Sequence, residues 1–82
     1  MTAYERLKIE EELKVFTLKN FENPSVCRNL DQIRFYCAEL CLKITEYENR
    51  FNFAPALAYE LLEQYQMQQN SLKETRNEKT SH

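Results

Sequence analysis

The most restrictive feature of this 82-residue sequence is that it contains no glycine. Two-residue β-hairpin turns depend on residues that tolerate positive φ, glycine above all, so a compact β-fold is disfavoured. Phosphate-binding loops, GxGxxG dinucleotide-binding turns and GxSxG nucleophile elbows also need glycine at fixed positions. Helices form well without it. The missing glycine therefore predicts an all-α fold and argues against these nucleotide-binding and hydrolytic sites.

The composition is that of one small globular domain. Hydrophobic residues make up 43% of the chain, and five Phe and five Tyr supply bulk for a core. A chain of this size buries only about 60% of its unfolded surface, so a binding partner would add useful stability. The only histidine is His82, which argues against a Ser-His-Asp or Cys-His catalytic site within the fold.

Charge and hydropathy bear on the location of the protein and on its partners. The net charge of −2 gives no electrostatic reason to expect nucleic acid or an anionic membrane as the main partner. No apolar segment resembles a signal peptide or a membrane span. An odd number of cysteines, three, fits a reducing compartment. We therefore expect a cytoplasmic protein.

Three helices are predicted, over residues 3–21, 30–51 and 55–69. Thr2 with Glu5 three residues later forms a capping box at the start of the first helix, and Asn29 is the expected cap of the second helix. Proline breaks the chain between these helices, in Asn23-Pro24-Ser25, and Pro55 suits the first turn of the third helix.

The chain is expected to divide into a single helical domain, residues 1–70, and a polar disordered tail, residues 71–82. Apolar positions fade after residue 66, and the tail is rich in Lys, Glu, Thr, Asn and Ser. The segment 30–51 is the long central helix, because its apolar residues follow a heptad register. These are Leu30, Ile33, Cys37, Leu40, Ile44, Tyr47 and Phe51.

Two of the three predicted helices carry apolar residues on opposite sides. In the central helix Phe35, Ala38 and Leu42 lie nearly opposite the heptad positions. In the first helix one face gathers Tyr4, Leu7, Val15, Leu18 and Phe21, and the other gathers Ile9, Leu13 and Phe16. A three-helix bundle needs only one apolar stripe per helix, and an exposed second stripe is unusual on a soluble monomer.

This surplus predicts a protein interface, most simply a homodimer. The expected interface residues are Leu13, Phe16, Phe35, Ala38 and Leu42, with Tyr59 and Met67 as weaker candidates. The predicted function is that of a non-catalytic protein-interaction module, a homodimeric regulator or adaptor that binds a larger protein. No cofactor and no small-molecule substrate are expected.

The cysteines leave a thiol-based metal site as an alternative. Cys37 and Cys41 lie one helical turn apart and Cys27 precedes them, so three thiolates are available to zinc. A structural zinc site takes four ligands, and His82 is the usual type of fourth ligand that this chain offers. Free cysteine also packs as a small hydrophobe, which is the simpler interpretation here.

A helix-turn-helix DNA-binding regulator is the other alternative. The helices at 30–51 and 55–69 are joined by a short connection, and Gln64, Gln68 and Asn70 are residue types that read bases. DNA affinity depends on Lys and Arg contacts to phosphate, however, and residues 51–72 contain no basic residue. The charge pattern therefore disfavours nucleic acid as a partner.

Overall fold

Three α-helices make up the regular structure of residues 1–80, which the computed structural model describes. They are α1 (Ala3–Asn20), α2 (Leu30–Phe51) and α3 (Ala56–Thr80). No strand occurs within these residues, so the prediction of an all-α, three-helix fold is confirmed. The bounds of α2 match the predicted central helix, and α1 ends one residue earlier than expected.

The first two helices begin at the predicted caps. The Thr2 hydroxyl accepts a hydrogen bond from the Glu5 amide at 3.1 Å. The Asn29 side-chain oxygen accepts from the Asp31 and Gln32 amides at 2.9 and 3.2 Å. Each cap satisfies amide groups that the first turn of a helix leaves without a carbonyl partner.

The connections show how the chain turns without glycine. Asn52 ends α2 in the left-handed conformation, with φ of 53°, and asparagine is among the residues best able to replace glycine there. Between α1 and α2, the Asn23 carbonyl accepts from the Val26 and Cys27 amides, both at 3.1 Å, and forms a short turn. The Asn23 side chain also accepts from the Ser25 amide, which fixes the start of that turn.

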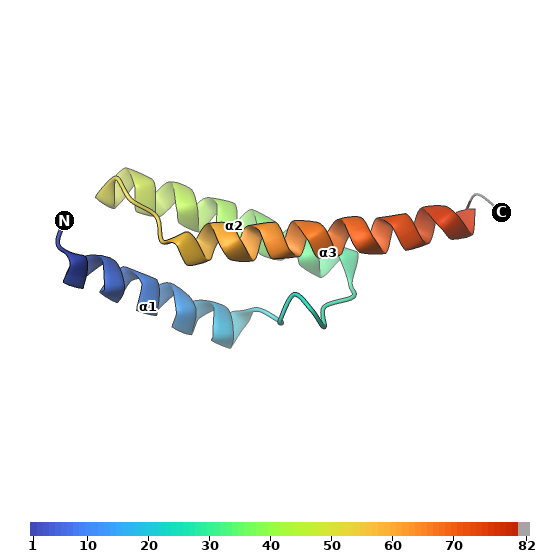
Figure 1. The fold of residues 1–82 in the computed structure, drawn as a ribbon, viewed down its shortest axis with the longest axis horizontal. Coiled ribbons are helices and arrows are strands. Elements are labelled where there is room, and N and C mark those ends of the chain that lie inside the picture. Colours follow the sequence, from blue (N-terminus) through green and yellow to red (C-terminus); the bar gives the residue numbers. More distant parts are fainter. Residues whose placement is uncertain (81–82) are drawn as a thin grey trace.

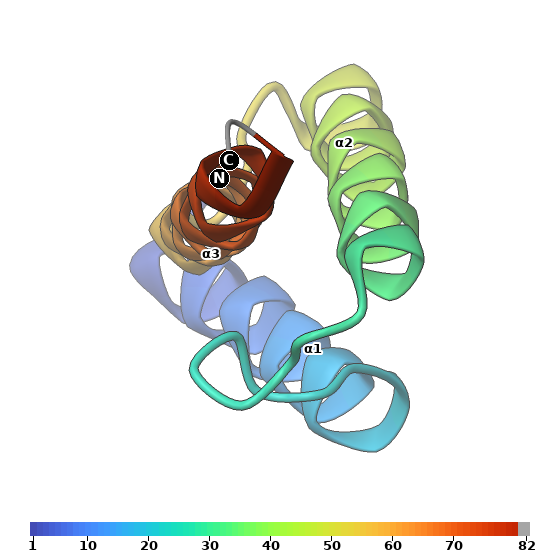
Figure 2. The same ribbon diagram turned by 90° about the vertical axis from the view of Figure 1, so that its right-hand side faces the viewer.

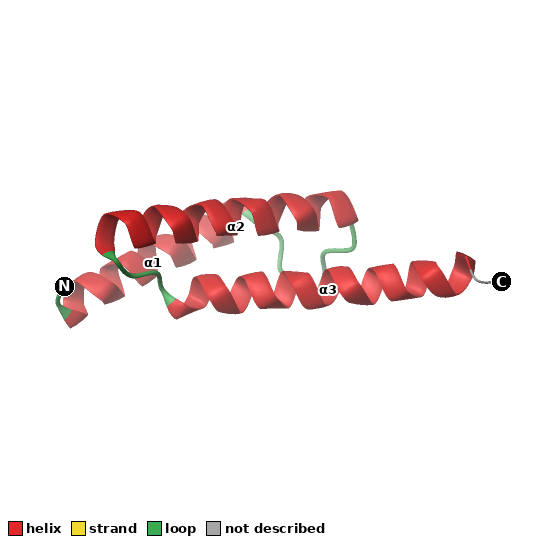
Figure 3. Ribbon diagram, turned by 90° about the horizontal axis from the view of Figure 1, so that it is seen from above, coloured by secondary structure: helices red, strands yellow, loops and turns green. Residues whose placement is uncertain are grey.

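The helices run alternately up and down along an elongated molecule (Figures 1 and 3). The molecule measures 55 × 21 × 16 Å along its principal axes. Figure 2, which looks along the bundle, shows the three helices at the corners of a triangle. The closest pair is α2 with α3, while α1 lies nearer to α3 than to α2. Large side chains bridge the wider spacing between α1 and α2.

The core consists of two hydrophobic clusters, one towards each end of the bundle. The first joins all three helices through Ile9, Leu13, Ile44, Tyr47 and Ala58. The second lies near the connection between α1 and α2 and contains Cys27, Ile33, Tyr36, Leu40 and Tyr65. The α2 residues of both clusters, Tyr36 apart, belong to the predicted heptad, which is therefore the intramolecular core.

Hydrogen bonds and rings attach the 21–29 connection to α3. The Tyr65 hydroxyl donates to the Glu22 carbonyl, and the Gln68 amide donates to the Cys27 carbonyl at 2.8 Å. The Phe21 ring stacks on Tyr36 with 4.5 Å between centroids. These contacts hold the C-terminal end of α1 against the α2–α3 pair.

The third helix is longer than the sequence predicted. The expected helix ended at residue 69 and a disordered tail began at 71, whereas α3 continues to Thr80. Leu72 also packs against the second core cluster, so contacts with the core extend past the predicted boundary at residue 70. The segment after residue 70 lacks glycine and proline and contains Lys, Glu and Arg, which continue a helix readily once it has begun. Residues 81–82 lie outside the described residues.

Candidate interaction surfaces

The outer side of α2 carries three predicted interface residues, and all three are exposed. Phe35 retains 57% and Leu42 retains 65% of its accessible surface, with Ala38 between them. We call these three residues the α2 outer patch. It lies opposite the buried residues Ile33, Leu40 and Ile44, as the heptad analysis indicated.

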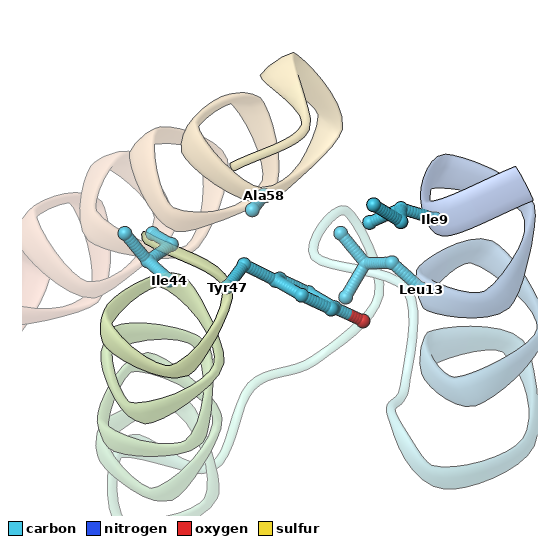
Figure 4. Close-up of a cluster of buried hydrophobic side chains, with 5 residues drawn as sticks. All are labelled: Ile9, Leu13, Ile44, Tyr47 and Ala58. Atoms are coloured by element: carbon cyan, nitrogen blue, oxygen red, sulfur yellow. The ribbon is translucent and has the colours of Figure 1, made fainter. Parts of the chain in front are cut away.

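The prediction for the first helix was wrong at Leu13. This side chain is completely buried, and Figure 4 shows it pointing between the helices towards Tyr47 and Ala58. Phe16 lies at the edge of the same face and is partly buried. Its ring lies beneath the Lys43 ammonium group, 4.5 Å from nitrogen to centroid, and meets the edge of Phe21 at 5.6 Å. Leu13 therefore belongs to the core, and Phe16 packs at the rim of the α1–α2 contact.

The opposite side of α1 faces solvent instead. Four large apolar residues on it are exposed, which we call the α1 outer stripe: Tyr4 at 74%, Leu7 at 64%, Val15 at 45% and Leu18 at 76%. The sequence placed all four on one face, but nothing in the pattern said that this face would point outward. The helix is nearly as apolar on one side as on the other, so periodicity cannot select the buried face.

The two weaker candidates are on α3. Tyr59 is 46% exposed, and its hydroxyl donates to the Glu48 carboxylate, a contact that raises the pKa of the phenol. Met67 is 64% exposed and borders a shallow hollow with Pro24 and Gln64. Both residues belong to α3, whereas the two outer faces belong to α1 and α2.

The three cysteines differ in exposure. Cys27 is buried, Cys37 is partly buried and Cys41 is exposed, and all three are free thiols. Burial raises the pKa of Cys27 and of Cys37, which favours the neutral thiol over the thiolate that binds metals or attacks substrates. Within the described residues no three His, Cys, Asp or Glu side chains are grouped to hold a metal ion. His82 lies outside the described residues.

A polar hollow in the surface lies at the start of α2. It has a volume of about 620 Å³ and is lined by Arg28, Asn29, Leu30, Asp31, Arg34 and Leu72. Asn29 already accepts from the first amides of the helix, and Arg34 pairs with Asp31 at 3.8 Å. Two of the lining residues, Asn29 and Arg34, are thus engaged with the chain itself.

The relation between α2 and α3 differs from a DNA-binding pair. In a helix-turn-helix the two helices cross at about 90–120°, and the second enters the major groove. Here α2 and α3 run side by side in opposite directions over their shared length (Figures 1 and 3). Gln64 and Gln68 are on the α3 side that meets the 21–29 connection. The pair is therefore an antiparallel helical hairpin.

Comparison with known proteins identifies no relative of this chain. No protein-family model, no curated protein and no solved structure matches the chain. None of the helices within residues 1–80 has a stretch long and apolar enough to cross a membrane.

Proposed function

We propose that this protein is a non-catalytic helical interaction module, a homodimeric regulator or adaptor that also binds a larger protein. One observation carries the proposal. Both α1 and α2 bury one apolar face in the core and still expose large apolar residues on the opposite face. Leu7, Leu18, Phe35 and Leu42 add no stability to the subunit while they are in water. A complex that buries them is stabilised by the hydrophobic effect.

The exposed side chains are sufficient to drive association. Full burial of one large apolar side chain contributes roughly 1.5–3 kcal/mol. If the four residues of one face, the α1 outer stripe, are buried on each subunit of a symmetric dimer, they give roughly 12–24 kcal/mol before allowance for their partial exposure. The loss of translational and rotational freedom on binding costs about 4–15 kcal/mol. The balance favours a dimer at micromolar concentration.

Two separate faces suit two different contacts. The α1 outer stripe and the α2 outer patch lie on different helices, and each is exposed while the opposite side of its helix enters the core. One face can therefore hold a second copy while the other binds a helix of the larger protein. The free thiols favour a reducing compartment, and we place the protein in the cytoplasm.

Light scattering on the purified chain tests the proposal. The subunit mass is 9.9 kDa, and we expect twice that mass at micromolar concentration. A charged residue on one of the two faces, either Leu18→Glu on α1 or Phe35→Glu on α2, should return the monomer mass. A wild-type chain that remains monomeric up to 100 micromolar, or about that, would contradict the proposal, since burial on this scale implies tighter association.

A further inference from the structure

The exposed face of α1 has a heptad register of its own. Positions 4, 7, 11, 14 and 18 are spaced alternately by three and four residues and fall within one narrow arc of the helix. Their residues are Tyr4, Leu7, Glu11, Lys14 and Leu18, and all five are exposed. We call these five residues the α1 outer seam. It is a coiled-coil seam without a partner helix in the subunit.

The two central positions of the seam carry opposite charges. Glu11 and Lys14 make no ion pair within the described part of the chain, where the two ion pairs present join Asp31 to Arg34 and Glu46 to Arg50. A charged residue at a coiled-coil core position weakens the pairing but determines which register and orientation the helices adopt. The orientation can therefore be worked out from these two charges.

In an antiparallel pair each layer joins an a position of one helix to a d position of the other. With the two-fold axis between residues 12 and 13, Leu7 meets Leu18 of the second copy. In the same register Glu11 meets Lys14 of the second copy, and the symmetry makes both contacts twice. A parallel pair would instead place Glu11 against Glu11 and Lys14 against Lys14, which is unfavourable in both layers.

We infer that a second copy of this chain packs antiparallel on the α1 outer seam, with Glu11–Lys14 ion pairs at its centre. The inference rests on the proposed function and specifies which face forms the dimer. The α2 outer patch then stays free for the larger protein. Along α1 the seam runs apolar, acidic, basic, apolar, and an antiparallel copy presents the same order reversed. Each acidic residue then meets a basic one, and this complementarity points to a second copy.

The charges of α1 argue against a lipid surface as the occupant. Membrane-surface helices combine an apolar face with an excess of Lys and Arg. The basic and acidic side chains of α1 are equal in number, four of each: Arg6, Lys8, Lys14 and Lys19 against Glu5, Glu10, Glu11 and Glu12. The helix therefore carries no net charge that would attract it to anionic lipid.

A charge exchange measured by sedimentation or light scattering tests the pairing. Glu11→Lys places lysine against Lys14 of the second copy in both central layers, and should raise the dissociation constant by at least roughly tenfold. Lys14→Glu should do the same. The two variants mixed together, or both changes in one chain, should restore dimerisation. Glu63→Lys is the matched control, because it makes the same charge change at an exposed position on α3.

Disulfide trapping reads the orientation directly. In a background with Cys27→Ala, Cys37→Ala and Cys41→Ser, one chain carries Leu7→Cys and another carries Leu18→Cys. Antiparallel packing places these two positions in one layer, within the Cα separation of about 4.4–6.8 Å that a disulfide spans. Mild oxidation of the mixture should give the mixed dimer, while each variant alone should stay monomeric on a non-reducing gel.

The outcomes separate the inference from the function on which it rests. A wild-type dimer that Leu18→Glu dissociates and Phe35→Glu leaves intact supports the antiparallel seam. A dimer that only Phe35→Glu dissociates, or that traps position 7 against position 7, overturns the inference and leaves the interaction module standing. A wild-type monomer overturns both. Circular dichroism shows whether each variant keeps its helices, and both changes are at exposed positions.

Discussion

The helices α1 and α2 each carry a series of residues at heptad spacing, but one series faces the core and the other faces solvent. In α2 the heptad points inward, and Ile33, Leu40 and Ile44 on it are buried. In α1 the heptad points to solvent, while Ile9 and Leu13 on the other side enter the core. The α2 heptad is apolar throughout, whereas two central positions of the α1 heptad are charged. Heptad spacing alone thus indicates a helix-packing face, and the residue types at its centre decide whether the subunit itself can bury it.

The largest expected difference in the free energy of unfolding is between alanine variants of two leucines of α2. Leu40 is fully buried and Leu42 is 65% exposed, two residues further along the same helix. Leu40→Ala should lower the free energy of unfolding by about 2–5 kcal/mol, because it removes core contacts and leaves a cavity. Leu42→Ala should change it by less than about 0.5 kcal/mol. Urea unfolding followed by circular dichroism measures both, and equal losses would contradict the assignment of the two faces.

A second pair of leucines makes the same comparison within α1. Leu13→Ala should cost about 2–3 kcal/mol, near the lower end for such changes, because the widely spaced α1 can settle into the space. Leu18→Ala should weaken dimerisation and leave the folding of the subunit nearly unchanged. Unfolding at two protein concentrations separates these effects, since only the dimer contribution depends on concentration. A large, concentration-independent loss for Leu18→Ala would show that the outer face belongs to the core.

Tyr65, on the inner side of the bundle, gives the stability of the fold a pH dependence. Burial raises the pKa of its phenol above the usual value of about 10. The folded state therefore holds this proton more tightly than the unfolded state, so the stabilisation is complete below pH 10 and declines as the pH rises above it. The decline should approach about 1.4 kcal/mol per pH unit for this one proton.

The matched variant is Tyr65→Phe. At pH 7 it should lose about 1 kcal/mol, because the Glu22 carbonyl loses its hydrogen-bond donor. Between pH 10 and 12, or about that range, its stability should fall less steeply than that of the wild type. Unfolding curves collected across this range test the sign, and parallel pH profiles for the two proteins would contradict it.

The smallest expected effect is at the rim between α1 and α2. Lys43→Met keeps the aliphatic part of the side chain but removes the ammonium group above Phe16. The loss should be about 0.5–1 kcal/mol, the usual size of an exposed cation–π contact. Lys73→Met, at an exposed position on α3, is the control and should have no measurable effect. An equal response of the two variants would show that the Lys43–Phe16 contact does not stabilise the packing of α1.

Local chemistry made most of the fold predictable. Thr2 and Asn29 are strong caps, proline breaks the chain at residue 24, and the α2 heptad identified its own buried face. The end of α3 was missed because a polar composition was interpreted as disorder, although Lys, Glu and Arg also favour a helix. Of the five predicted interface residues, Phe35, Ala38 and Leu42 are exposed, Phe16 is partly buried and Leu13 is in the core.

The sequence by itself determined that this chain forms three helices, where two of them begin, and that it has more apolar surface than three packed helices require. Only the tertiary structure decided which side of α1 faces the core. Both sides carry residues such as Leu13 and Leu18 that favour burial equally, so no local preference separates them. The choice came from shape, because Ile9 and Leu13 fit beside Tyr47 and Ala58, and fit between side chains distant in sequence exists only once the helices have packed.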